Sequence, residues 1–139
     1  KEQALPGFSL VGLKTIVRTT CSAALPEIFG SEKNVFLEVA IVSDSAMRKL
    51  NAEYRGKNRS TDVLSFGNFS SPEIIKRFRG KRLDLGQIIL APEFVRRSAR
   101  SDGVLWKHEL VFVFVHGILH LLGFDSGFVH QKHLVFLAP

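Results

Sequence analysis

LVFVFVHGILHLLGF, residues 110–124, is the longest apolar run in the chain, and its interpretation decides the fold. The part at 111–115 has high strand propensity, so a buried strand with His116 and His120 as core histidines is one interpretation. A run of 15 residues, broken only by two histidines and two glycines, is long for a strand and typical of a central buried helix. We therefore predict a helix from about Val104 to Gly123, where glycine can reverse the chain.

On that helix His116 and His120 lie about one turn apart on the same face, where two imidazoles can bind one metal ion. Zinc proteases of the HExxH type carry a glutamate base directly after the first histidine. Gly117 stands in that place here, which argues against proteolysis.

A third ligand is the open question of this motif, because the residue ten places after His116 is Ser126, a poor zinc ligand. Asp125 could bind the metal directly, although we favour a hydrogen bond from it to a ligand imidazole. His130 or His133 could substitute for the missing ligand, and the alternative is that both are ordinary surface histidines. Glu109, two turns before His116, is a weaker candidate for a ligand or for its hydrogen-bond partner.

Length and composition predict one domain over residues 1–139, with 45% hydrophobic residues and a mean hydropathy of +0.12, as in soluble globular proteins. Cys21 is the only cysteine, so an internal disulfide and a CxxC metal site are both absent. The longest apolar run falls short of the roughly 20 residues that span a bilayer, so we expect no membrane insertion.

Positive charge is concentrated in the middle of the chain. The net charge is +6 and the isoelectric point is near 9.8. Such a concentration attracts nucleic acid through phosphate contacts, although a solvated surface of a basic protein is an equally open interpretation. Between residues 55 and 100 lie 11 of the 19 basic residues: Arg55, Lys57, Arg59, Lys76, Arg77, Arg79, Lys81, Arg82, Arg96, Arg97 and Arg100.

The remaining elements alternate between helix and strand. The predicted helices cover residues 11–25, closed by Pro26, then 44–54, capped by Ser43 or Asp44, and 92–100, opened by Pro92. The predicted strands cover 35–42, 61–66 and 85–91, and residues 67–83 are predicted to be a long loop. We therefore expect an α+β fold: a small mixed sheet of three to four strands covered by helices, with the histidines on a central helix.

Three motifs in this order carry a resemblance to a known family: LNAEYRGKNRSTDVLSF (50–66), LDLGQIIL (83–90) and HGILHLLGFD (116–125). Together they resemble the YbeY family of metal-dependent endoribonucleases over roughly residues 10–125. The resemblance implies single-strand-specific RNA cleavage in the maturation of ribosomal RNA, including the 3′ end of the small-subunit RNA, and in ribosome quality control. It implies ribosomal RNA and the small ribosomal subunit as partners, and a cytoplasmic location, or an organellar one in a eukaryote.

The resemblance also assigns roles to residues. The family binds its metal, usually taken as zinc, through three histidines, of which the first two correspond to His116 and His120 and the third to Ser126. The arginine of its YRGK turn corresponds to Arg55, which would hold a phosphate oxygen through its planar guanidinium. Without the resemblance, Arg55 reads as a turn residue paired with Asp44 or Glu53. The predicted catalytic residues are Arg55 and His116, and the predicted RNA-binding residues are Arg55, Lys57, Arg59, Arg77 and Arg82.

The chain departs from the family pattern at several positions. Ser60 and Gly67 replace prolines, Gln87 replaces an acidic residue, and the likeness ends after Asp125, so the tail from about residue 126 is atypical.

Two other function classes therefore stay open: a non-catalytic RNA- or ribosome-binding relative, and a metal-dependent hydrolase of a small substrate. Metal content separates the first class from enzymes, and salt-sensitive RNA affinity separates the RNA-directed classes from the second.

Overall fold

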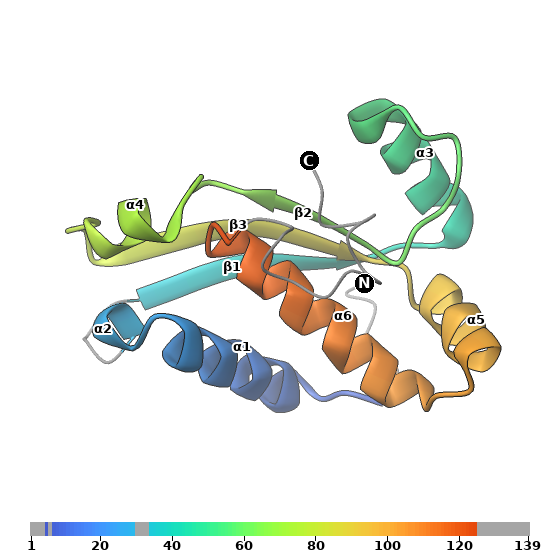
Figure 1. The fold of residues 1–139 in the computed structure, drawn as a ribbon, viewed down its shortest axis with the longest axis horizontal. Helices are drawn as coiled ribbons and strands as arrows, with labels where there is room; N and C mark the ends of the chain where they lie inside the picture. Colours follow the sequence, from blue (N-terminus) through green and yellow to red (C-terminus); the bar gives the residue numbers. More distant parts are fainter. Residues whose placement is uncertain (1–4, 6, 30–33, 125–139) are drawn as a thin grey trace.

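A mixed sheet of three strands forms the middle of the molecule in the computed structural model, which describes residues 5, 7–29 and 34–124 (Figure 1). The strands are β1 (Asn34–Ile41), β2 (Val63–Gly67) and β3 (Arg82–Leu90). Their order is β1-β3-β2, with β1 parallel and β2 antiparallel to the central β3. The predicted α+β class and mixed sheet are confirmed.

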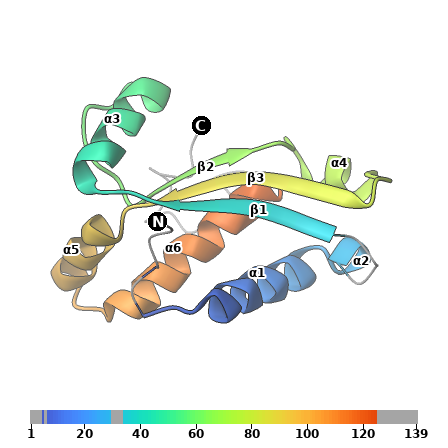
Figure 2. The same cartoon turned by 180° about the vertical axis from the view of Figure 1, so that it is seen from behind.

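Helices cover the two faces of the sheet unequally, as Figures 1 and 2 show. One face packs against α1 (Leu10–Ala24) and α6 (Trp106–Leu121), whereas α3 (Asp44–Arg55) lies over one end of the other face. The short helix α4 (Pro72–Lys76) lies at the opposite end of the sheet from α3, α2 (Pro26–Phe29) follows α1, and α5 (Pro92–Asp102) precedes α6. Among the described residues no single helix is long and apolar enough to cross a membrane; α5 and α6 meet that test only as a pair, bent by 119°.

Two apolar clusters hold these layers together. The main core joins β3 to α6 through Leu83, Leu85, Ile88, Leu90, Val113, Phe114, Ile118 and Leu121. A smaller cluster on the other face lies beneath α3 and contains Met47, Leu64, Ile89 and Ala91. The smaller cluster occupies only one end of the face that α3 covers. Polar and aromatic side chains occupy the rest of this face. Buried Cys21, whose thiol pKa is raised by burial to about 12, belongs to the main core.

The helix boundaries follow local signals in the sequence. The Ser43 hydroxyl accepts a hydrogen bond from the Ala46 backbone N–H at 3.2 Å, and Gly56 ends α3 in the left-handed conformation. Pro92 occupies the first turn of α5, where its missing N–H has no cost. The predicted caps and the predicted start of α5 are thus confirmed.

The apolar run at 110–124 is helical as far as Leu121, which confirms the predicted central helix and excludes the strand interpretation. The helix lies close to the sheet at Gly117, where an added Cβ would come within 3.1 Å of the Ser65 hydroxyl and 3.3 Å of the Ile88 side chain. Gly123 turns the chain with φ of 86°, and a Cβ there would lie 2.6 Å from the Cα of Ser71. Gly117 therefore faces the sheet, where a glutamate would find no room.

The predicted loop at 67–83 is wrong in two places. Helix α4 lies within it, begun by Ser71, whose hydroxyl accepts from the Ile74 N–H at 3.4 Å, and strand β3 already begins at Arg82. Helix α4 is too short to show a helical period, and the first part of β3 forms by pairing with β1, which lies far away in sequence. Pro26 likewise starts α2 rather than merely closing α1.

Candidate functional site

His116 lies on α6 with 5% of its surface exposed. Its Nδ1 lies 2.8 Å from the carbonyl oxygen of Phe112, and its ring meets the Phe112 ring edge-on at 4.0 Å. A carbonyl oxygen only accepts, so Nδ1 donates, and Nε2 is the ring nitrogen that is left to bind a metal ion. A histidine whose tautomer is held by a backbone carbonyl in this way is typical of metal ligands that bind through the other nitrogen.

His120 follows one turn later on the same helix. Its Nδ1 is buried and has no hydrogen-bond partner in the described part of the chain. Burial, and then the nearby positive charge of Arg55, lower the pKa of this imidazole below its usual value. The ring is therefore neutral at pH 7, which is the form that binds a metal ion.

Arg55 ends α3 on the other side of the sheet, yet its charge reaches His120. Its Nε and Nη1 are buried without a hydrogen-bond partner among the described residues. Burial, and then the charge of Arg59, lower its pKa, and Asp62 opposes them. The alternative pairing with Asp44 is wrong, because the carboxylate of Asp44 instead accepts from Arg97 and from the Ser60 hydroxyl. Desolvated guanidinium donors without a partner are suited to an anionic group such as phosphate.

The buried carboxyl group of Asp62 lies near this arginine, and a second one, that of Glu109, lies near Asp62. The sequence did not single out Asp62. Asp62 is 2% exposed, and its Oδ1 accepts from the Val63 N–H at 2.8 Å and the Thr61 hydroxyl at 3.3 Å. Burial, assisted by the negative charge of Glu109, raises the pKa of Asp62 to about 8 against the effect of those hydrogen bonds. Its place directly before a buried strand was the available signal. Glu109, 7% exposed, thus acts electrostatically on Asp62.

The histidine pair offers part of a metal site. Within residues 5, 7–29 and 34–124 no group of three or more His, Cys, Asp or Glu side chains could hold a metal ion. The two imidazoles, one with a buried nitrogen that has no partner in the described part of the chain, fit a divalent ion that takes further ligands from elsewhere. The candidates for those ligands, Asp125, Ser126, His130 and His133, lie outside the described residues.

The basic residues are divided between the two ends of the sheet rather than gathered in one patch. Lys57 and Arg59 follow α3, near Arg55, whereas Arg77 ends α4 and Arg82 begins β3 at the far end (Figure 1). Several of the other cations already have partners on the protein: Lys76 pairs with Glu27 at 3.2 Å, Arg96 lies over Trp106 at 4.4 Å, and Arg97 pairs with Asp44.

The fold and the site define a small α+β domain with a candidate metal centre beside a desolvated arginine. A family model described as Endoribonuclease YbeY matches residues 8–134. The chain therefore belongs to the YbeY family.

Individual relatives agree with this assignment. Proteins named Endoribonuclease YbeY from Sulfurovum sp. and Wolinella succinogenes are 36% and 41% identical to this chain, over 78% and 66% of it and 75% and 59% of their own lengths. One from Bdellovibrio bacteriovorus is 35% identical over 64% of this chain and 52% of its own length. A solution structure of a Thermotoga maritima protein aligns with a TM-score of 0.53 at 26% identity, covering 94% of this chain and 79% of that one.

The match covers only part of several relatives. The chain spans 52% and 65% of the lengths of the Bdellovibrio bacteriovorus and Mycoplasmopsis synoviae proteins.

Membership of this metal-dependent family supports a divalent metal ion as the cofactor.

Proposed function

We propose that this protein is a divalent-metal-dependent endoribonuclease that cleaves single-stranded RNA during the maturation of ribosomal RNA. The observation that carries the proposal is the electrostatic proximity of Arg55 to His120: among the described residues, two buried nitrogens of Arg55 and one of His120 have no hydrogen-bond partner. Family membership and relatives named as endoribonucleases supply the reaction class.

Each residue of the site has a role in this reaction. His116 and His120 would hold the metal ion, His116 through Nε2 because its Nδ1 donates to the Phe112 carbonyl. The ion, for which we propose zinc, supplies an activated water and offsets charge on the phosphate. Arg55 binds a phosphate oxygen, and burial strengthens that contact because little water competes with it.

The RNA contacts extend beyond the reacting phosphate. We assign Lys57 and Arg59 to the strand next to Arg55, and Arg77 and Arg82 to more distant phosphates. The proposed substrate is ribosomal RNA, including the 3′ end of the small-subunit RNA, and the proposed partner is the small ribosomal subunit. Such a role would place the protein with ribosomes, in the cytoplasm or in an organelle.

Elemental analysis combined with an RNA cleavage assay tests the proposal. Protein purified without chelator should contain a divalent metal and cut a single-stranded RNA, and it should lose both after dialysis against chelator and in His116→Ala. Because Ser126 replaces the third family histidine, Ser126→His should raise metal occupancy. His130→Ala and Asp125→Asn test the alternative ligands, since the variant that lowers occupancy identifies the third ligand.

The outcomes separate the three function classes. Salt-sensitive RNA binding without metal and without cleavage would indicate a non-catalytic RNA-binding relative. A metal-loaded protein that hydrolyses small phosphate esters but neither binds nor cleaves RNA would indicate a hydrolase of another substrate. Either result would overturn the proposed endoribonuclease.

A further inference from the structure

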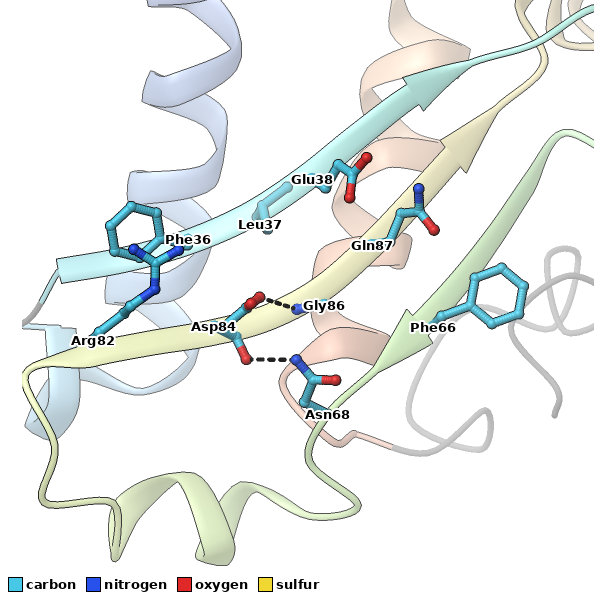
Figure 3. A pocket seen from close by; sticks show the side chains of 9 residues that line it. All are labelled: Phe36, Leu37, Glu38, Phe66, Asn68, Arg82, Asp84, Gly86 and Gln87. Atoms are coloured by element: carbon cyan, nitrogen blue, oxygen red, sulfur yellow. Dashed lines mark hydrogen bonds between the residues drawn. The ribbon is translucent and has the colours of Figure 1, made fainter.

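The face of the sheet that α3 leaves open is hollowed, with a cavity volume of about 510 Å³ (Figure 3). We call it the sheet-face hollow; it is lined by the side chains of Phe36 and Glu38 on β1, Arg82, Asp84 and Gln87 on β3, and Phe66 and Asn68 at the end of β2. In Figure 3 these side chains stand on the near side of the sheet, with α1 and α6 behind it. The hollow is therefore separate from the core and open to solvent.

A bulge at Gly86 builds the hollow. The pairing of β1 with β3 shifts here, from Phe36 opposite Asp84 to Glu38 opposite Gln87. Side chains alternate along a regular strand, so Asp84 and Gln87, which are three residues apart, would lie on opposite faces if β3 had no bulge. Gly86 adopts φ of 121°, and a Cβ there would lie 2.1 Å from the carbonyl oxygen of Phe66. The bulge thus places a carboxylate and an amide on the same open face.

Aromatic rings flank the hollow at both ends. Phe36 is 39% exposed, and the Arg82 guanidinium lies over its ring at 3.7 Å. At the other end Phe66 packs edge-on against Tyr54 at 5.0 Å, and Tyr54 directly precedes Arg55. Aromatic rings and guanidinium planes on an open sheet are the surfaces on which single-stranded RNA bases stack.

The polar groups of the hollow are mainly hydrogen-bond acceptors. Glu38 is exposed and makes no hydrogen bond or ion pair within the described residues, and Asp84 uses Oδ1 to accept from the Gly86 N–H at 3.1 Å. Asn68 donates through Nδ2 to the Asp84 backbone carbonyl at 3.0 Å, which leaves its Oδ1 as an acceptor. The two carboxylates of the hollow, against the single cation Arg82 at one end of it, favour hydrogen-bond donors such as base amino groups between them.

We propose that the sheet-face hollow binds one unstacked RNA base that carries an exocyclic amino group, such as cytosine. The base stacks on the aromatic and guanidinium surfaces while Glu38 accepts from its amino group and Gln87 bonds the rest of its edge. The Phe66–Tyr54 contact connects this subsite to Arg55, so a strand held at Arg55 can continue onto the open sheet. This inference rests on the proposed RNA substrate.

Cytidine and uridine monophosphates test the subsite directly, because they differ in the amino or carbonyl group of the base and its neighbouring ring proton. We titrate each into the full chain and follow the side-chain amide signals of Gln87 and Asn68 by nuclear magnetic resonance. Cytidine monophosphate should bind about tenfold more tightly than uridine monophosphate, since one well-placed base-edge pair discriminates by about that factor. Glu38→Gln and Gln87→Ala should each reduce this preference to less than about threefold.

Glu93→Gln, an exposed carboxylate on α5 outside the hollow, is the matched control and should keep the preference. Equal affinity for the two nucleotides, or a preference that survives both hollow variants, would overturn the subsite. RNA cleavage by the unaltered protein is measured separately. Loss of the nucleotide preference alone therefore counts against the subsite, whereas absence of cleavage alone counts against the endoribonuclease.

Discussion

Single nitrogen atoms without partners are the most informative features at the residue scale. A buried polar group left without a hydrogen bond costs about 1–3 kcal/mol, and more when it is charged. Within the part of the chain that the structure describes, Arg55 carries two such nitrogens and His120 one, and the two residues come from helices on opposite faces of the sheet. The phosphate and the metal ion that we propose for this site would satisfy all three nitrogens.

Arg55→Ala should reduce RNA cleavage by about 100-fold, because it removes a contact that acts mainly on charge developing at the reacting phosphate. RNA affinity should fall by less than about tenfold, since the other cations remain. Arg55→Lys should restore affinity more than cleavage, because an ammonium lacks the planar two-point geometry. Single-turnover cleavage and fluorescence anisotropy measure the two effects.

Lys49→Ala on the exposed face of the same helix is the control for net charge. It should leave the cleavage rate at the reacting phosphate within about threefold of the unaltered protein. Equal losses of cleavage and affinity in Arg55→Ala would show that Arg55 serves binding alone.

Asp62 should make the folded state less stable as pH rises. Its pKa is about 8 in the folded protein and about 3.9 in the unfolded chain. Between those values only the folded state keeps the proton, so the free energy of unfolding should fall by at most about 1.4 kcal/mol per pH unit and level off above pH 8. Asp62→Asn should remove this slope while keeping an acceptor for the Val63 N–H.

Urea denaturation of both proteins from pH 5 to pH 9 measures the difference. The stability gap should move in favour of Asp62→Asn as pH rises. A gap that is independent of pH would show that Asp62 does not take up a proton on folding.

At the residue scale, the sequence predicted the relations that follow from the spacing of residues along one helix. The shared face of His116 and His120 follows from a separation of four residues, and the structure agrees. The proximity of Arg55 to His120 came only from the resemblance, because α3 and α6 lie on opposite faces of the sheet and only the tertiary fold brings the two charges within reach. The electrostatic link between Asp62 and Glu109 was missed for the same reason.

At the scale of elements, the bulge in β3 is the feature most sensitive to substitution. Gly86→Ala would place a Cβ 2.1 Å from the Phe66 carbonyl oxygen, so β2 must move away from β3. We expect a loss of at least about 3 kcal/mol in the free energy of unfolding, from overpacking together with the positive φ.

Gly56→Ala is the matched control, since its φ of 68° is also positive but no atom of the described residues lies within 4 Å of the added Cβ. It should cost only about 1–2 kcal/mol. Chemical denaturation compares the two variants, and equal losses would show that backbone strain alone, without the clash, explains the effect.

The sequence predicted the helix ends that are marked by residues at the ends themselves. It missed the features that depend on pairing with strands far away in the sequence. Ser43, Gly56 and Pro92 mark helix ends by their own chemistry, and the structure has those ends. The bulge at Gly86 exists only because two other strands flank β3, so no window of sequence around it contains the cause. Helix α4 is too short for a periodic signal.

On the scale of the whole molecule, the division of positive charge predicts two kinds of RNA contact. Arg77 lies at the end of the sheet far from Arg55, so it can contact only a distant phosphate. Arg77→Ala should weaken RNA binding and lower the slope of log affinity against log salt by about 0.7 for single-stranded RNA, with little change in cleavage of bound RNA.

Arg97→Ala is the control for loss of a positive charge, because its guanidinium is already paired with Asp44. It should leave the salt slope nearly unchanged. Identical slopes for Arg77→Ala and the unaltered protein would exclude a phosphate contact at this end of the molecule.

The strand order β1-β3-β2 has a consequence for how the chain is made. In the described sheet both earlier strands pair only with the last one, so neither has a partner until residues 82–90 have left the ribosome. Contacts that join distant parts of a chain form slowly, because a long loop must close first. Synthesis of residues 82–90 is therefore the step that allows β1 and β2 to form a sheet with β3. A pause in translation before this step would prolong the time for which the apolar residues of β1 and β2 stay unpaired.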